Sequence, residues 1–222
     1  IILFILGGLQ GFIGWFMVKS GLVPQKYFVG HVELTTHFIA ALGLLCYTLW
    51  FALSMLIKKH QLVVHSKLKN FLLGILVVMF LQLIYGGFMA GLRAAVIAPT
   101  WPDINGSMAP AGMWELSPTT VNLVNNPLTV HFIHRGLAYL LLILIAAWWF
   151  KSKNITGNKL FNRLKLAVFL LVLTQVTLGI LTVLNAVHAN RLVVLGVLHQ
   201  FTAMMLLTVI VSLIFVVRRK AV

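Results

Sequence analysis

The sequence predicts an all-α integral membrane protein: six transmembrane helices are visible of an eight-helix bundle made of two four-helix repeats. Three observations lead to this fold class. Hydrophobic residues make up 61% of the 222-residue chain and charged residues only 9%, whereas about a quarter of a soluble domain is charged. Six apolar runs each reach the roughly 20 residues that a helix needs to cross a bilayer. A short motif recurs within several of these runs at matched positions, which indicates an internal repeat.

The six expected helices follow one another along the whole chain. A closed β-barrel is the other architecture that spans a membrane. The continuous apolar run from Leu137 to Ala146 lacks the two-residue alternation of a barrel strand, so helices are favoured. The expected helices cover about residues 1–18, 31–57, 70–92, 129–150, 164–187 and 193–217.

Lysine and arginine are distributed unequally between the two sides of the membrane. Twelve of the 17 lie after the second, fourth and sixth expected helices, and four lie in the connections on the opposite side. Positive residues concentrate in cytoplasmic loops, so linker 58–69 and the C-terminus are expected on the cytoplasmic side. The net charge of +14 is then a topology signal and a contact with anionic membrane lipid, and no nucleic-acid partner is expected.

Cysteine usage and the chain start exclude other classes. Cys46 has no second cysteine with which to form an internal disulfide, and the missing CxxC and CxxCH motifs argue against zinc and against covalently attached haem. The first apolar run is a full span without a cleavage site, so it is not read as a signal peptide. Because the chain starts at Ile1 without an initiator methionine, we expect its start to be a cut through a longer protein.

A long connection, residues 93–128, separates the third and fourth expected helices on the outer side. It combines the turn formers of Trp101-Pro-Asp-Ile-Asn-Gly106 and Asn125-Asn-Pro127 with a further tryptophan, Trp114. Turn residues interleaved with tryptophan favour an ordered cap over the outer mouth of the bundle. An exposed flexible loop is the alternative.

A motif shared by three helices indicates the internal repeat. It is Gln-x-x-x-Gly, at residues 10–14, 82–86 and 175–179. His37 and His199 follow the first and third copies, each on the next helix. Residues 70–222 then form one four-helix unit, residues 1–57 are the second helix pair of the other unit, and two further helices are expected before residue 1. A chance match between apolar helices is the alternative.

Three histidines on three different helices are expected at one depth. His37, His134 and His199 each lie five or six residues from the outer end of their helix, which is roughly 8–9 Å below the interface at about 1.5 Å per residue. The neighbours His134 and Arg135 are costly at membrane depth, so they require partners or a function.

This arrangement predicts a haem site. Histidine is the usual axial ligand of haem iron, and helix bundles hold cofactors between facing helices, so we pair His134 with His199 as ligands of one haem iron. Zinc requires three or four ligands, and the acidic residues of the sequence are few: Glu33, Asp103 and Glu115. Arginine suits the haem propionates, and candidates lie at the outer helix ends: Arg93, Arg135 and Arg191.

The remaining histidines receive different interpretations. His37 is expected to ligate a second haem iron, with its partner on an absent helix, although a lone intramembrane histidine is more often a packing residue. His131 lies one turn before His134 and is interpreted as an interfacial hydrogen-bond partner. The others are expected at the surface: His60, His65 and His188.

Several stretches together resemble haem A synthase, the membrane enzyme that makes the haem of terminal oxidases. They run from end to end of the chain, and jointly they are specific: Gln10-Gly-x-x-Gly-Trp-x-Met-Val-x-Ser-Gly21, Tyr85-Gly-x-x-x-Ala-Gly-Leu-Arg93, Trp101-Pro-x-x-Asn-Gly106, His134-Arg135, Gly179-Ile-x-Thr182 and His199-Gln200. The resemblance implies eight helices in two similar halves, with haem B held by His134 and His199 and the substrate, haem O, near His37.

The resemblance also implies an oxidoreductase. It would convert the C8 methyl of haem O into the formyl group of haem A, with an external electron donor and with haem O synthase or oxidase assembly factors as partners. The family's catalytic glutamate and a His-Arg pair on the second helix have no counterpart here, so the catalytic residue is expected outside this chain. Glu33 lies four residues before His37, where several relatives would carry arginine. The host is expected to be a bacterial plasma membrane or a mitochondrial inner membrane, with the histidines toward the periplasm or intermembrane space.

Two other functions fit part of the pattern. A di-haem b-type cytochrome that relays electrons from quinol would also use intramembrane histidines. Such a relay is expected to place haems near both membrane surfaces, whereas the candidate ligands here share the outer side. A transporter with proton-relay histidines is a weaker alternative, because relays usually include intramembrane acids and this chain has almost none.

Overall fold

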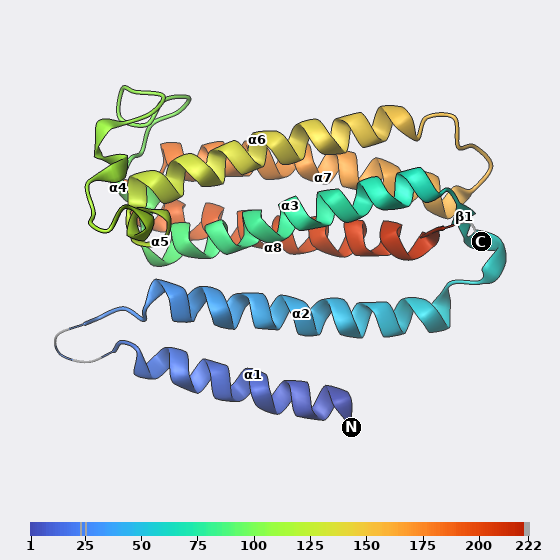
Figure 1. Ribbon diagram of the computed structural model, residues 1–222, viewed down its shortest axis with the longest axis horizontal. Helices are drawn as coiled ribbons and strands as arrows, with labels where there is room; N and C mark the ends of the chain where they lie inside the picture. The colour runs from blue at the N-terminus through green and yellow to red at the C-terminus, as the bar shows by residue number, and fades with distance from the viewer. Residues whose placement is uncertain (23, 25, 220–222) are drawn as a thin grey trace.

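The computed structural model describes residues 1–22, 24 and 26–219, and its architecture is helical throughout (Figure 1). Within the described residues, six helices are long and apolar enough to cross a membrane. They are α1 (Ile2–Lys19), α2 (His31–Leu56), α3 (Ser66–Gly91), α6 (Pro127–Lys151), α7 (Lys159–Leu184) and α8 (Ala189–Val216). The predicted class, an all-α multi-pass membrane protein, is confirmed. The eight-helix parent remains a prediction.

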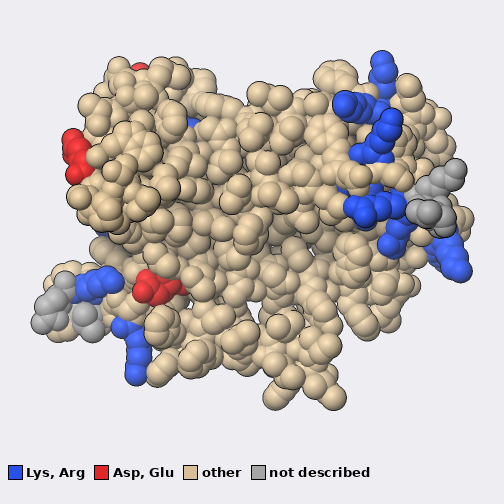
Figure 2. All heavy atoms as spheres, in the orientation of Figure 1, with Lys and Arg blue, Asp and Glu red and all other residues tan. Residues whose placement is uncertain are grey.

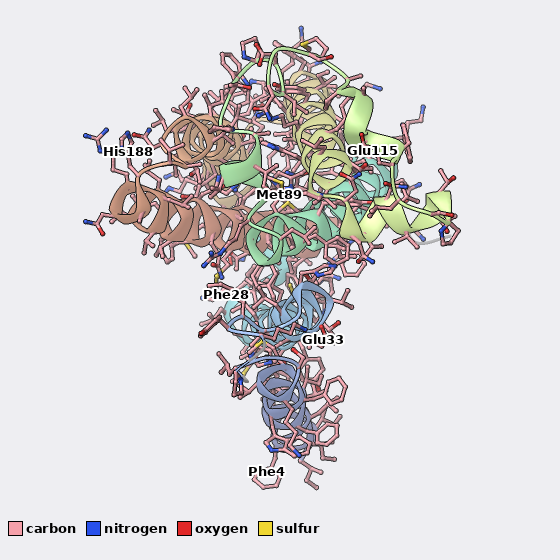
Figure 3. All side chains as sticks on the ribbon, turned by 90° about the vertical axis from the view of Figure 1, so that its left-hand side faces the viewer. Phe4, Phe28, Glu33, Met89, Glu115 and His188 are labelled. Atoms are coloured by element: carbon pink, nitrogen blue, oxygen red, sulfur yellow. The ribbon has the colours of Figure 1, made fainter. Side chains whose placement is uncertain are left out.

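The long helices are arranged as a four-helix unit with a two-helix layer against it. Helices α3, α6, α7 and α8 form the unit, α2 packs against α3 and α8, and α1 packs against α2. The end-on view shows α2 and then α1 projecting from one side of the unit (Figure 3). Helix α1 has no buried residue, so most of its apolar surface is open to lipid or to another protein segment.

Four helices, α3, α6, α7 and α8, begin earlier than hydropathy predicted, and asparagine side chains cap the starts of α6 and α7. Asn126 precedes α6 and accepts a hydrogen bond from the Leu128 amide at 2.9 Å, with Pro127 in the first turn. Asn158 caps α7 in the same way through the Phe161 amide at 2.9 Å. Asparagine is a preferred N-cap and proline is tolerated in the first turn, so polar residues that read as loop belong to these helices.

The tightly packed core lies in the half of the four-helix unit next to the α6–α7 connection. Trp148 of α6 and Phe161 of α7 are fully buried there, and their rings lie 5.9 Å apart. Every buried residue of α8 lies from Thr202 onward. The N-terminal half of α8, up to Phe201, therefore contributes no fully buried side chain, although it carries His199.

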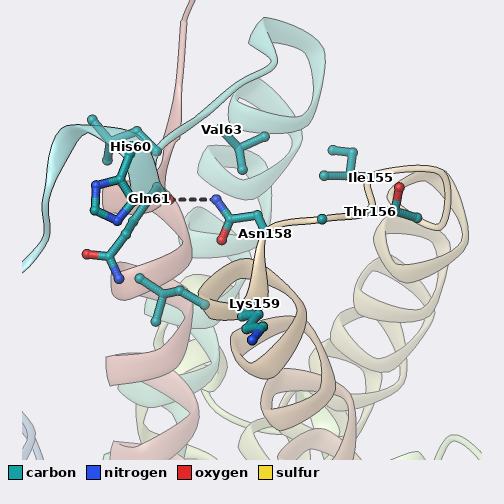
Figure 4. A pocket seen from close by; sticks show the side chains of 10 residues that line it. His60, Gln61, Val63, Ile155, Thr156, Asn158 and Lys159 are labelled. Atoms are coloured by element: carbon teal, nitrogen blue, oxygen red, sulfur yellow. Dashed lines mark hydrogen bonds between the residues drawn. The ribbon is translucent and has the colours of Figure 1, made fainter.

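Two short strands that the sequence did not reveal lie at the end of the bundle where α2 leads to α3 and α8 ends. Strand β1 (Val63–Val64) pairs in parallel with β2 (Val217–Arg218), where a linker and a helix end were expected. Beside this pair, two connections enclose a pocket of about 630 Å³ (Figure 4), and Asn158 Nδ2 donates to the Gln61 carbonyl oxygen across it at 2.8 Å. This pocket lies at the end of the bundle opposite connection 93–128, so it is separate from His134 and His199.

The connection between α3 and α6 folds as a cap at the other end of the bundle (Figure 1). It contains α4 (Ala94–Ile97), the 3₁₀ turns η2 (Ala111–Trp114) and η3 (Thr119–Val121), and α5 (Asn122–Asn125). Asn126 is buried and donates to the Gly112 carbonyl at 2.7 Å. Buried amides that hydrogen-bond to loop backbone give the connection a defined conformation, as predicted for an ordered cap.

Basic side chains gather at the end of the molecule opposite the cap. On the face shown in Figure 2, most lysine and arginine atoms lie at that end, acidic atoms lie toward the cap, and the middle belt is uncharged. The acidic residue Glu33 lies in the first turn of α2, where a negative charge suits the helix dipole.

Candidate functional site

His134 of α6 and His199 of α8 face each other in the four-helix unit. Their ring centres lie 6.5 Å apart, and the ring planes make an angle of 67°. When two imidazoles bind one metal ion from opposite sides, each metal–nitrogen bond is about 2 Å long and each nitrogen lies about 1 Å from its ring centre. The two ring centres are then roughly 6 Å apart. The separation suits one metal ion between two imidazoles; that the two rings bind a haem iron stays a prediction.

Each of the two rings also has one nitrogen that is buried and without a hydrogen-bond partner among the described residues. In both His134 and His199 this atom is Nδ1. A buried polar atom without a partner is costly in protein and more so in a membrane. A metal bond would satisfy such an atom, since neutral imidazole binds metals through either nitrogen.

The packing around the histidines agrees with a flat cofactor. The fully buried side chains of α8 begin at Thr202, and in α7 the buried positions Val168 and Val172 lie deeper than the level of His199 while Val183 lies beyond it. At the level of the histidines the side chains of α7 and α8 are thus not fully buried, whereas Val130 and His131 of α6 are. The residues present fit a bis-histidine haem.

A glutamine and a glycine from the neighbouring helix contact each of the two rings. Gln82 Nε2 lies 3.3 Å from His134 Nε2, and Gln175 Nε2 lies 3.1 Å from His199 Nε2. A Cβ built on Gly86 would lie 3.4 Å from Cε1 of His134. Each imidazole therefore lies against bare helix backbone beside an amide group.

His37 makes a third set of contacts of the same kind, away from the pair of His134 and His199. Gln10 Nε2 of α1 lies 3.2 Å from His37 Nδ1, and a Cβ on Gly14 would lie 2.9 Å from His37 Cε1. Thr35, two positions earlier, packs instead against Gly87 of α3. Residues two positions apart lie on nearly opposite faces of a helix, so α2 turns Thr35 toward the four-helix unit and His37 toward α1.

Arg135 is directed into the cap. Its Nη1 donates to the carbonyl oxygen of Asp103 at 2.6 Å and its Nη2 to that of Thr100 at 2.5 Å. Nη1 also lies 3.2 Å from the Pro102 carbonyl oxygen. Sequence reasoning placed this arginine next to a haem ligand but did not show that it holds the cap, because the carbonyls come from a loop more than 30 residues away.

His131 accepts a hydrogen bond from Arg135 Nε at 3.0 Å and is fully buried. It is covered by the cap, and its expected position at the membrane interface stays a prediction. The expected hydrogen bond exists, but its partner is Arg135 one turn later.

Arg93 lies directly before α4 in a left-handed backbone conformation and stacks its guanidinium 3.7 Å from the ring centre of Phe28. Phe28 belongs to the connection between α1 and α2 and lies where that layer meets the four-helix unit (Figure 3). Stacking uses the flat face of the guanidinium and leaves its N–H edges for hydrogen bonds.

The cap turn beside Arg135 is stabilised by a carboxylate. Asp103 Oδ1 accepts a hydrogen bond from the Gly106 amide at 2.9 Å. This bond, with contributions from Thr100 and the Arg135 charge, holds the pKa of Asp103 below its ordinary value of 3.8. The carboxylate is therefore ionised at neutral pH and stays available to the turn.

Fold and site together define a multi-pass membrane protein with paired intramembrane histidines suited to haem. The sequence profile described as cytochrome oxidase assembly protein matches residues 1–211. The chain belongs to this family.

Curated relatives carry a more specific name. Proteins called haem A synthase from Bradyrhizobium sp. strain BTAi1, Pelagibacter ubique and Flavobacterium johnsoniae are 38%, 36% and 34% identical over 93–94% of this chain. The chain spans 56–60% of the length of these relatives. No solved structure matches the chain.

Proposed function

We propose that this chain is part of a haem A synthase, an enzyme that oxidises the C8 methyl of haem O to a formyl group and so provides haem A to terminal oxidases. The observation that carries the proposal is the histidine pair, 6.5 Å apart on α6 and α8, in a chain whose relatives bear the name haem A synthase over most of its length. Conversion of a methyl to a formyl group removes four electrons from the carbon and adds one oxygen atom. The oxygen source, dioxygen or water, and the electron partner are external to the described residues.

His134 and His199 are the proposed axial ligands of haem B. Bound between them, this group supplies one-electron redox chemistry. The chain's own contribution is to hold two neutral imidazoles with a fixed separation and to keep bulk water out of the outer half of the bundle through the cap. The 6.5 Å between the ring centres supports the first of these roles.

Arg93 and Arg135 are the proposed partners of the haem propionates. Four hydrogen bonds leave Arg135 with one of its five N–H groups unassigned among the described residues. The face of the Arg93 guanidinium contacts the Phe28 ring, which leaves its N–H edges for an acceptor. Carboxylates are the natural acceptors for both.

The substrate, haem O, is proposed to bind at His37 on the opposite face of α2. This division assigns residues 1–57 to the substrate half, 58–69 to a linker and 70–222 to the haem B half with cap 93–128. It also explains why His37 points away from the histidine pair. Haem O synthase is a proposed partner because it would supply the substrate, and co-purification of the two proteins from native membranes tests this contact.

The histidines are proposed to lie near the periplasmic or intermembrane surface. The basic connections support this orientation, because they gather at the opposite end. Single cysteines at Ser107 in the cap and at Lys153 between α6 and α7, in a Cys46→Ser background, measure it. We expect a membrane-impermeant maleimide applied from outside to label the cap position and spare the other; the reverse pattern would overturn the orientation.

Haem extraction from the natural protein, purified from its membrane, tests the function. Chromatography with mass detection is expected to find haem B together with haem O or haem A. Haem B alone, at two per protein, would favour the electron-relay alternative, which the names of the relatives do not support. A preparation without any haem would refute the proposal.

A further inference from the structure

The same three-residue arrangement surrounds each of the three intramembrane histidines. In every case a glutamine and a glycine four residues later on one helix contact the imidazole of a histidine on the next helix. The three sets are Gln10, Gly14 and His37; Gln82, Gly86 and His134; and Gln175, Gly179 and His199. We propose that these glutamines are positioning residues that orient the imidazoles for haem iron, which deepens the proposed function and rests on it.

The geometry of the contact carries the proposal. A glutamine four residues before a glycine is on the same helix face, so the amide stands beside the gap that the glycine leaves. A Cβ on Gly179 would lie 3.0 Å from Cε1 of His199, closer than most real contacts of a Cβ. The glycine therefore lets the ring lie on the backbone, and the glutamine meets one of its nitrogens.

The unpaired atoms indicate what the amide does. In the two sets of the four-helix unit, the glutamine Oε1 and the histidine Nδ1 are buried and lack partners among the described residues. An amide presents either its oxygen or its nitrogen to the same neighbour when it turns over. With the oxygen toward the ring, it accepts the imidazole N–H and leaves the opposite nitrogen as a lone pair for the metal.

This arrangement matches what metal-bound histidines require. The non-ligating nitrogen of such a histidine almost always donates to an acceptor, which fixes the tautomer and ring orientation and raises the ligand's basicity. Here the acceptor comes from α3 for His134 and from α7 for His199. The 67° angle between the two ring planes is therefore set by two independent helix contacts.

Gln175→Leu and Gln175→Glu test the inference on the haem-loaded natural protein. Leucine removes the acceptor, so haem B is expected to transfer to apomyoglobin at least about tenfold faster, the midpoint potential to rise, and the low-spin EPR signal, which depends on the angle between imidazole planes, to change. Glutamate keeps an acceptor and accepts more strongly, so it is expected to retain haem and shift the potential in the opposite direction. Opposite shifts distinguish orientation of the ligand from a loss of packing.

Gln200→Leu is the matched control, because Gln200 is next to His199 on the same helix but exposed. Gly179→Ala should resemble Gln175→Leu, whereas Gly196→Ala should not, since a Cβ at Gly196 meets nothing within 4 Å. If Gln175→Leu behaves like Gln200→Leu in haem transfer, potential and EPR signal, the inference is wrong while the haem site stands. If the wild-type protein holds no haem, the proposed function itself fails.

Discussion

Replacing His199 with alanine is expected to remove haem B from the protein. The substitution deletes one of the two imidazoles proposed to hold the haem iron, whose ring centres lie 6.5 Å apart. Loss of a residue that only supports a metal ligand costs about 10–100-fold in affinity, so loss of the ligand itself is expected to exceed that range. Haem B content per purified protein, with the low-spin visible spectrum, provides the measurement, and His134→Ala should give the same result.

Two further histidine variants define the site. His188→Ala should retain full haem B, because His188 is exposed at the start of α8. His37→Ala should also retain haem B while losing bound haem O, because His37 faces α1 and not the histidine pair. Equal haem B loss in His37→Ala and His199→Ala would contradict the assignment of the two haems to separate sites.

Replacing Arg135 with alanine is expected to loosen the cap. The change removes donors to the backbone oxygens of Thr100, Pro102 and Asp103. Hydrogen bonds from a charged group are each worth about 1.5–3 kcal/mol; because water will replace some of them, we expect a loss of about 3 kcal/mol in the local stability of the cap. If the free energy needed to open the cap falls by this amount, we expect proteases to cleave within residues 98–126 roughly 100-fold faster.

Arg135→Lys should restore only part of the protection, since one ammonium group cannot reproduce a planar fork that spans several carbonyls. Arg191→Ala is the control: Arg191 is exposed, and its described hydrogen bond is to Asn185 Oδ1 at 3.3 Å. Cleavage of Arg135→Ala at the wild-type rate would show that the cap is held by its asparagines alone. Weaker haem binding in the same variant, with the cap intact, would instead support a propionate contact.

The helices themselves could be predicted because the bilayer imposes a simple rule on the sequence. Each span needs an apolar run of defined length and must satisfy its own backbone hydrogen bonds, so composition alone reveals it. The errors fell at the ends of helices, where Asn126 and Asn158 act as caps, and at strands β1 and β2, which pair residues about 150 positions apart. Hydropathy contains no information on such pairing.

The sequence by itself determined the membrane class and the six spans, and it predicted a common depth for His37, His134 and His199, because rise per residue converts position in a helix into depth. Depth does not say which helix faces which. The sequence also predicted the pair His134 and His199, but only the tertiary structure showed that their rings lie 6.5 Å apart, that His37 turns toward α1, and that Arg135 holds the cap. Those facts depend on the rotation of each helix about its axis, which is set by side-chain packing between helices and not by hydropathy.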